Sequence, residues 1–127
     1  MRRSPARPGP DRRAAERHGQ RGEVLAALFL QAKLYRLLAR RFRTPVGEID
    51  IVAERGGVLV FVEVKARGHK TSEAAALGAV NRRRIARAAQ FWLARHPADA
   101  GRDCRFDVIF LAPGRWPRHL INAFQAP

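Results

Sequence analysis

A pair of strand-like segments joined by two glycines constrains this chain more than any other feature. Residues 47–54 and 58–65 are rich in β-branched side chains, which favour strands. Gly56 and Gly57 lie between them, and glycine tolerates the positive φ that tight hairpin turns require. The sequence therefore predicts an antiparallel hairpin.

The register of this hairpin follows from the glycine turn. If the two glycines are the loop, Arg55 pairs with Val58, and Asp50 then lies opposite Glu63. Because side chains alternate along a strand, we expect one continuous apolar face made of Val58, Val60, Val62, Val64, Ile49, Ile51 and Ala53. The opposite face is apolar near the turn, and its far end carries Glu48, Asp50, Glu63 and Lys65.

The two facing carboxylates, Asp50 and Glu63, repel each other at about 5 Å between their Cβ atoms. A protonated partner, a nearby cation or a bound metal ion would offset this repulsion. Oxygen ligands suit Mg²⁺ or Mn²⁺, and such an ion lowers the pKa of bound water and stabilises charge developing at phosphorus. Lys65 would then orient or deprotonate the attacking water, or neutralise the transition state. The alternative is an exposed strand end without metal, and in either case we expect Glu48 to pair with Lys65.

The remaining sequence patterns predict an α/β sandwich. Apolar residues at helical spacing indicate helices over 22–39 and 72–96. Strands are expected over 40–44 and 104–112, with a last short element near 119–124. The long second helix leaves room for a parallel crossover. We therefore expect a central mixed sheet, an antiparallel hairpin plus a parallel crossover strand, flanked by helices.

Length and composition indicate one domain preceded by a basic segment. The chain has 127 residues, 46% of them apolar, which is enough for a real core. Residues 1–21 hold seven arginines and few apolar residues, so we expect a flexible basic arm ahead of a single folded domain over 22–127. The arm is either a phosphate-binding tail or a dispensable extension. No apolar run approaches the roughly 18 residues that cross a bilayer, so we expect a cytoplasmic protein without membrane contact.

The charge balance points to a polyanionic partner. Lys and Arg total 25 against 11 Asp and Glu, which gives a formal net charge of +14. We expect phosphate contacts from two groups of basic side chains, one after the hairpin and one on the second helix. These are Arg67 and Lys70, then Arg82, Arg83, Arg84 and Arg87. His69, in the first group, is either a general base or an exposed loop histidine.

Several other reactive or aromatic residues have structural interpretations. A single cysteine, Cys104, excludes an intrachain disulfide and a Cys-cluster zinc site, and we expect it to be a small buried residue. Asp107 lies in an otherwise apolar strand and should have a buried partner, such as an arginine. We expect Trp92 and Phe91 to belong to the core.

The hairpin motifs resemble those of a known bacterial family. Gly47-Glu48-Ile49-Asp50-Ile51-Val52 is followed by Val60-Phe61-Val62-Glu63-Val64-Lys65-Ala66-Arg67. The likeness continues through residues 89–96 and 104–108 and ends near residue 124. This arrangement resembles the YraN family, which is grouped by fold with restriction-endonuclease-like nucleases. The resemblance covers nearly everything from Gly22 onward, and it implies a restriction-endonuclease-like sandwich, an endonuclease-like domain, over 22–127.

The resemblance implies a nuclease signature of an Asp, a spacer and Glu-x-Lys. Here it falls on Asp50, twelve intervening residues, Glu63 and Lys65. The resemblance implies Asp50 and Glu63 as ligands of Mg²⁺ or Mn²⁺, the Val64 carbonyl as a further ligand, and Lys65 as a catalytic residue. Branched-DNA resolvases of the same superfamily add a Glu from the first helix, and Glu23 occupies that place. Glu23 would equally suit a helix N-terminus without any catalytic role.

Two departures from the family pattern are Ile49, where related nucleases have Pro, and Asn81, where the family often has Lys. We expect a metal-dependent endonuclease that hydrolyses DNA phosphodiester bonds, including those of branched or junction DNA. The alternative is a non-catalytic nucleic-acid-binding protein that keeps the nuclease fold. Net charge fits both functions. The carboxylate pair favours the enzyme, because a phosphate binder gains nothing from negative charges gathered in its groove.

Overall fold

One mixed sheet organises the computed structural model, which describes residues 22–66 and 72–127. Its strands lie side by side in chain order: β1 (Arg36–Thr44), β2 (Gly47–Arg55), β3 (Val58–Ala66), β4 (Cys104–Leu111) and β5 (Arg118–Phe124). Only the β3–β4 pair is parallel; the other three pairs are antiparallel. This confirms the expected α/β fold with a mixed sheet.

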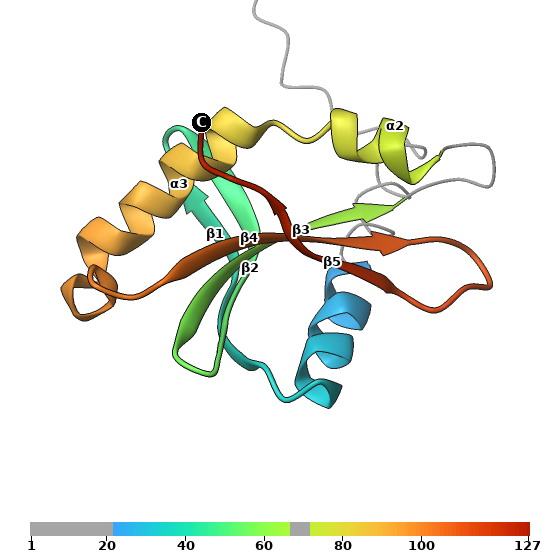
Figure 1. Ribbon diagram of the computed structural model, residues 1–127, viewed down its shortest axis with the longest axis horizontal. Helices are drawn as coiled ribbons and strands as arrows, with labels where there is room; N and C mark the ends of the chain where they lie inside the picture. The colour runs from blue at the N-terminus through green and yellow to red at the C-terminus, as the bar shows by residue number, and fades with distance from the viewer. Residues whose placement is uncertain (1–21, 67–71) are drawn as a thin grey trace, which may run out of the picture.

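Helices cover both faces of the sheet (Figure 1). The helix over residues 22–32 packs on one face, and α2 (Glu73–Gly78) and α3 (Arg82–Arg95) pack on the other. A short 3₁₀ helix, η1 (Pro97–Asp99), follows α3 and leads the chain back to β4. The crossover from β3 through α2 and α3 makes the parallel β3–β4 pairing possible.

The β2–β3 hairpin has the expected register. Arg55 pairs with Val58, and both turn glycines have positive φ, 59° at Gly56 and 81° at Gly57. Both central residues of a primed hairpin turn need this conformation. The paired register runs as far as Ile51 and Val62. Beyond this pair, at the open end of the hairpin, the Val64 N–H donates to the Asp50 side chain. The candidate site lies at this open end.

The apolar face of the hairpin is confirmed with one exception. Ile51, Ala53, Val60 and Val62 are buried together against the helix over residues 22–32, with Val58 and Val64 packed beside them. Ile49 was expected on this face, but it lies in the cluster under α3. Its partner in β1 is Phe42, which packs against the same cluster. Phe42 follows Arg41, whose φ of 51° interrupts the regular strand and permits this change of face.

The predicted helix over 22–39 is wrong in its second half. The helix ends at residue 32, and Leu34 takes a left-handed φ of 69°. Leu37 and Leu38 then lie on β1 and pack into opposite core clusters. Their spacing fits a helix as well as a strand, so periodicity alone could not separate the two. The expected strand over 40–44 is the second half of β1.

The predicted helix over 72–96 is two helices. α2 ends at Gly78, and α3 begins after Asn81, whose side-chain oxygen accepts a hydrogen bond from the Arg84 N–H at 3.2 Å. Asparagine is among the favoured residues at this capping position. The cap satisfies a backbone donor at the start of α3. The chain therefore begins a new helix after Asn81, although the apolar pattern continues without a break and predicted a single helix.

Asp107 has the buried partners expected of it. Its side chain is fully buried and accepts hydrogen bonds from Arg105 at 2.8 and 2.9 Å, and from the Asn122 N–H at 2.9 Å. His119 lies 2.7 Å away on the same carboxylate, and Lys33 lies 2.7 Å from the other ring nitrogen of His119. This network joins β4 and β5 to the segment that follows the first helix.

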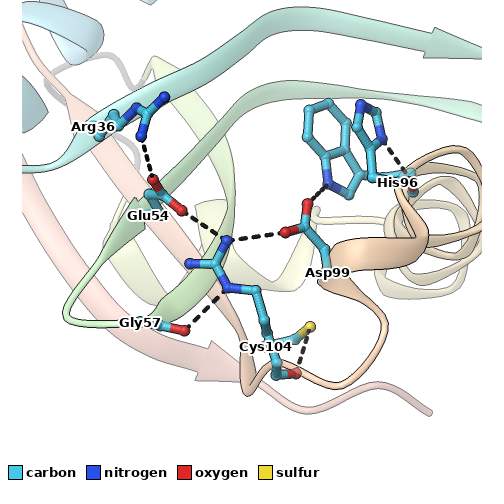
Figure 2. Close-up of polar contacts among 8 residues, drawn as sticks. Arg36, Glu54, Gly57, His96, Asp99 and Cys104 are labelled. Atoms are coloured by element: carbon cyan, nitrogen blue, oxygen red, sulfur yellow. Dashed lines mark hydrogen bonds and ion pairs between the residues drawn. The ribbon is translucent and has the colours of Figure 1, made fainter.

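A second polar network lies at the closed end of the hairpin (Figure 2), which we call the hairpin end. Arg102 donates to Glu54 at 2.7 Å and to Asp99 at 3.0 Å, and Arg36 reaches Glu54 at 3.3 Å. Asp99 also accepts the indole N–H of Trp92 at 3.2 Å. Trp92 is buried, as expected. Cys104 lies beside this network and is exposed, so the prediction that it is buried is wrong. It is the first residue of β4, ahead of the buried part of that strand.

Candidate functional site

Four carboxylates gather at the open end of the hairpin, which we call the acidic end: Glu23, Glu48, Asp50 and Glu63. Glu23 comes from the helix over residues 22–32, Glu48 and Asp50 from β2, and Glu63 from β3. One carboxylate oxygen from each of Glu23, Glu48 and Asp50 lies within 4.8 Å of the other two. Glu23 is 7% exposed. Glu48 is exposed and Asp50 is half-buried, so residues far apart in sequence place acidic oxygens close together at the edge of the core.

Asp50 and Glu63 contact each other across the hairpin. The Asp50 carboxylate accepts the Val64 N–H at 2.8 Å, which fixes its orientation. The two carboxyl groups share a hydrogen bond. The two side chains therefore point to the same side of the sheet, as the register predicts for directly opposed residues.

Burial makes this pair hold a proton. Loss of hydration and, to a smaller extent, the nearby Asp50 charge raise the pKa of Glu63 to about 8, with Lys65 opposing the shift. Burial also raises the pKa of Asp50, to about 6, against the hydrogen bond from Val64; Glu23 and Glu48 add to the rise. At neutral pH the structure thus favours a proton on Glu63 that is donated to an ionised Asp50.

The basic partners at the acidic end differ from those expected. The Lys65 ammonium lies 3.6 Å from Glu63 Oε1, and Glu48 lies 3.6 Å from Arg43. The expected Glu48–Lys65 ion pair is therefore wrong. Because the strands separate beyond Ile51 and Val62, Glu48 is closer to its β1 neighbour, with which it is paired in the sheet.

Arg41 is a residue of this site that the sequence did not reveal. Its Nε donates to Glu23 Oε2 at 2.6 Å, and the charges of Glu23, Glu48 and Asp50 all raise its pKa, the hydrogen bond to Glu23 most of all. Its φ of 51° lies in the left-handed region, which is unusual for a side chain of this size. Arg41 stands among several arginines in sequence, and only the backbone conformation distinguishes it from its neighbours.

The donor set at the acidic end suits a hard divalent cation. Glu23, Glu48 and Asp50 offer three carboxylate oxygens, which are the ligands that Mg²⁺ and Mn²⁺ prefer. The close group includes Glu23 and Glu48 beside the predicted Asp50, and it does not include Glu63, which reaches the group through Asp50. Val64 contacts Asp50 through its N–H; its carbonyl as a ligand stays a prediction.

The arginines expected to bind phosphate lie at and near the start of α3. Arg82, Arg83, Arg84 and Arg87 are all exposed. Arg84 donates to the Val46 carbonyl at 3.4 Å, and its backbone lies against Gly47, so the start of α3 sits beside the turn that leads into Glu48. Arg83 and Arg87 line a surface hollow of about 380 Å³. The basic patch on α3 is thus next to the strand that carries Asp50.

Some of the expected contacts lie outside the described residues. These are Arg67, His69 and Lys70, which follow β3, and the basic segment over residues 1–21. Within the described ranges, no helix is both long enough and apolar enough to cross a membrane.

Comparison with known proteins identifies the family. Residues 22–111 match the model described as "Uncharacterised protein family UPF0102". A UPF0102 protein from Methylorubrum extorquens (strain PA1) is 53% identical over 123 residues, which cover 97% of this chain and 96% of that protein. Another from Methylobacterium nodulans is 54% identical over 114 residues, covering 90% and 88% respectively. The chain therefore belongs to the UPF0102 family, as its resemblance to YraN-like proteins led us to expect.

Proposed function

We propose that this protein is a metal-dependent endonuclease that hydrolyses phosphodiester bonds of DNA. The observation that carries the proposal is the acidic end, where Asp50 and Glu63 share a hydrogen bond and Glu23 and Glu48 complete a group of close carboxylates. Close carboxylates repel one another and destabilise the folded protein, so their grouping favours a functional role over a purely structural one. Family membership is compatible with the proposal but does not name a reaction.

Each side chain has a role that its contacts support. Asp50, oriented by the Val64 N–H, and Glu23, which accepts a hydrogen bond from Arg41, would hold the ion together with Glu48 or Glu63. When bound, a Mg²⁺ or Mn²⁺ ion supplies an activated water and stabilises negative charge at phosphorus. Lys65 lies 3.6 Å from Glu63, where it would steer the attacking water or neutralise charge on the phosphate.

The basic surface would bring the polyanion to this site. The net charge of +14 and the exposed arginines of α3 favour phosphate contacts, which are independent of base sequence. Binding would therefore weaken steeply with added salt. We keep the expectation that the protein acts in the cytoplasm.

The test is cleavage of labelled single-stranded, duplex, flapped and four-way-junction DNA with Mg²⁺, with Mn²⁺ and with chelator. Asp50→Asn is the test variant, and Asp103→Asn is its matched control because Asp103 is an exposed aspartate at the other end of the sheet. We expect chelator-sensitive cutting by the wild type and by Asp103→Asn, and at least a hundredfold loss in Asp50→Asn. Tight binding without cutting by any of the three proteins would instead favour the non-catalytic nucleic-acid-binding protein.

A further inference from the structure

Trp116 is the most exposed large apolar side chain in the described part of the chain. It is 88% exposed, whereas Trp92, the other tryptophan, is 5% exposed. Tryptophan carries a large apolar surface and is normally well covered, so an indole left in water is informative. The core does not use this side chain, and the proposed hydrolysis has not used it either.

The chain holds Trp116 in this position with several local restraints. It lies in the β4–β5 hairpin loop, where Gly114 takes a φ of 68° and the Arg115 N–H donates to the Ala112 carbonyl at 3.2 Å. Pro117 follows it directly, and a residue before proline is restricted to extended conformations. The loop thus presents the indole on a backbone with few alternatives, which lowers the entropy lost when it binds a partner.

The sheet register puts this loop at the same end of the molecule as the acidic end. β3 and β4 run parallel, with Glu63 beside Val108 and Lys65 beside Phe110. Phe110 in turn pairs with Arg118, two residues after Trp116. Trp116 therefore lies about four residues, roughly 13 Å, beyond Glu63 along the strand direction, and two strands, roughly 10 Å, away across the sheet. Figure 1 shows the β4–β5 loop extending from this side of the sheet, near the end of β3 and α2.

The surroundings of Trp116 favour a nucleic acid over an apolar partner. Arg115 and Arg118 flank it, and both are exposed. Arg118 is anchored by Glu73 of α2 at 2.8 Å, with its side chain still 66% exposed. An exposed aromatic ring with arginines nearby in the chain is a combination that binds single-stranded nucleic acid, since the ring stacks on a base while the cations contact phosphates. In a continuous duplex the faces of the bases are already stacked, so the ring needs an unpaired or splayed base.

We propose that Trp116 stacks on an unpaired base a few nucleotides from the cleavage site, so that the protein selects DNA containing single-stranded or branched segments. This inference rests on the proposed nuclease function, which makes the acidic end the cleavage site, and it adds which DNA structures the protein would select. The combined separation from Glu63, on the order of 16 Å, corresponds to about five nucleotide steps along one stacked strand. The base contacted by Trp116 would therefore lie several nucleotides from the bond that is cut.

Tryptophan fluorescence of the full-length protein tests the proposal without any cutting. With chelator present, we titrate a single-stranded oligonucleotide, a blunt duplex and a duplex with a single-stranded gap. We expect the emission of the wild type to be quenched by the single-stranded and gapped DNA and much less by the duplex. Trp116→Ala should bind the single strand about ten- to a hundredfold more weakly and the duplex equally well. Trp116→Phe should keep most of the binding, and Leu34→Ala, which removes another highly exposed apolar side chain, should have no effect.

Two results would overturn the proposal. One is equal affinity of wild type and Trp116→Ala for single-stranded and gapped DNA. The other is an emission change with anionic lipid vesicles but none with DNA, which would assign the exposed indole to a membrane surface. Because Asp50→Asn should show the same quenching as the wild type, failure of the nuclease proposal would leave this result intact. Cutting that is equally fast in Trp116→Ala on all DNA structures would count against Trp116 alone.

Discussion

The two ends of the β2–β3 hairpin treat their carboxylates in opposite ways. At the hairpin end, Arg102 bridges Glu54 and Asp99, and the hydrogen bond from Arg102 holds the pKa of Asp99 below its ordinary value (Figure 2). At the acidic end, burial raises the pKa of Asp50 to about 6 and that of Glu63 to about 8. One end pairs its charges and joins η1 to the sheet. At the other end Glu23, Glu48 and Glu63 each have a basic neighbour, whereas Asp50 forms no ion pair within the described residues.

Burial alone does not explain this difference. Asp107 is fully buried, and burial raises its pKa, yet hydrogen bonds from His119, Arg105 and the Asn122 N–H outweigh burial and leave the pKa below its ordinary value. Asp50 receives one backbone N–H and lies beside three other carboxylates. The supply of donors and cations therefore decides which buried acid is stable as an ion. Asp107 stabilises the fold, and the acidic end is held together despite its repulsion.

The largest effect that we expect separates Asp107 from the acidic end. Asp107→Asn should destabilise the protein by about 3–5 kcal/mol, because Arg105 and His119 lose the anion that compensates them in a buried position. Asp50→Asn should leave the free energy of unfolding unchanged or increase it. Urea denaturation of the two variants at pH 7 measures both values. Equal destabilisation by the two substitutions would contradict the distinction between them.

Next in size is the effect of pH on the protein without metal. The folded protein keeps a proton on Glu63 up to a pKa of about 8, whereas the unfolded chain releases it near 4.5. The folded state therefore binds more protons between these values, so stability should fall as pH rises from about 4.5 to about 8 and level off above that. Glu63→Gln removes this dependence and should be more stable than the wild type at pH 9 by on the order of 2 kcal/mol. Thermal denaturation in chelator from pH 5.5 to 9 provides the measurement, and parallel curves for the two proteins would refute the shift.

Glu54→Gln makes the matched change at the hairpin end. The substitution weakens contacts with Arg36 and Arg102, so the melting temperature should fall by a few degrees, where Glu63→Gln raises it at high pH. Added salt should reduce this loss because part of the pairing is exposed. A rise in melting temperature for Glu54→Gln would show that the two ends do not differ in the way described.

The smallest effect concerns Arg41, the cation of the acidic end that donates to Glu23. Arg41→Gln frees Glu23 and removes a positive charge beside the proposed ion, so Mn²⁺ should bind roughly three- to tenfold more tightly. Arg40→Gln, which changes the exposed neighbouring arginine, is the control. Calorimetric titration of both variants gives the affinities. Weaker binding in Arg41→Gln would mean that Arg41 chiefly orients Glu23.

Local sequence patterns could predict the hairpin, its register and the contact between Asp50 and Glu63, since the two glycines fix which residues face each other. They could not locate the break before Asn81 or the end of the first helix near Leu34, because both interrupt an apolar pattern that continues on either side. The roles of Arg41 and Trp116 could not be predicted from the sequence either. The position of Arg41 depends on a left-handed backbone conformation within a strand, and the exposure of Trp116 depends on how the rest of the chain packs around it.

We expect the acidic end to exchange a proton for a divalent ion. Titration of Mn²⁺ into the DNA-free protein at pH 7, in buffers of different ionisation enthalpy, measures both the affinity and the protons released. With Glu63 mostly protonated and Asp50 mostly ionised at this pH, binding should release about one proton per ion. Asp50→Asn should bind at least tenfold more weakly. Binding without proton release, or equal affinity in Asp50→Asn, would contradict the claim.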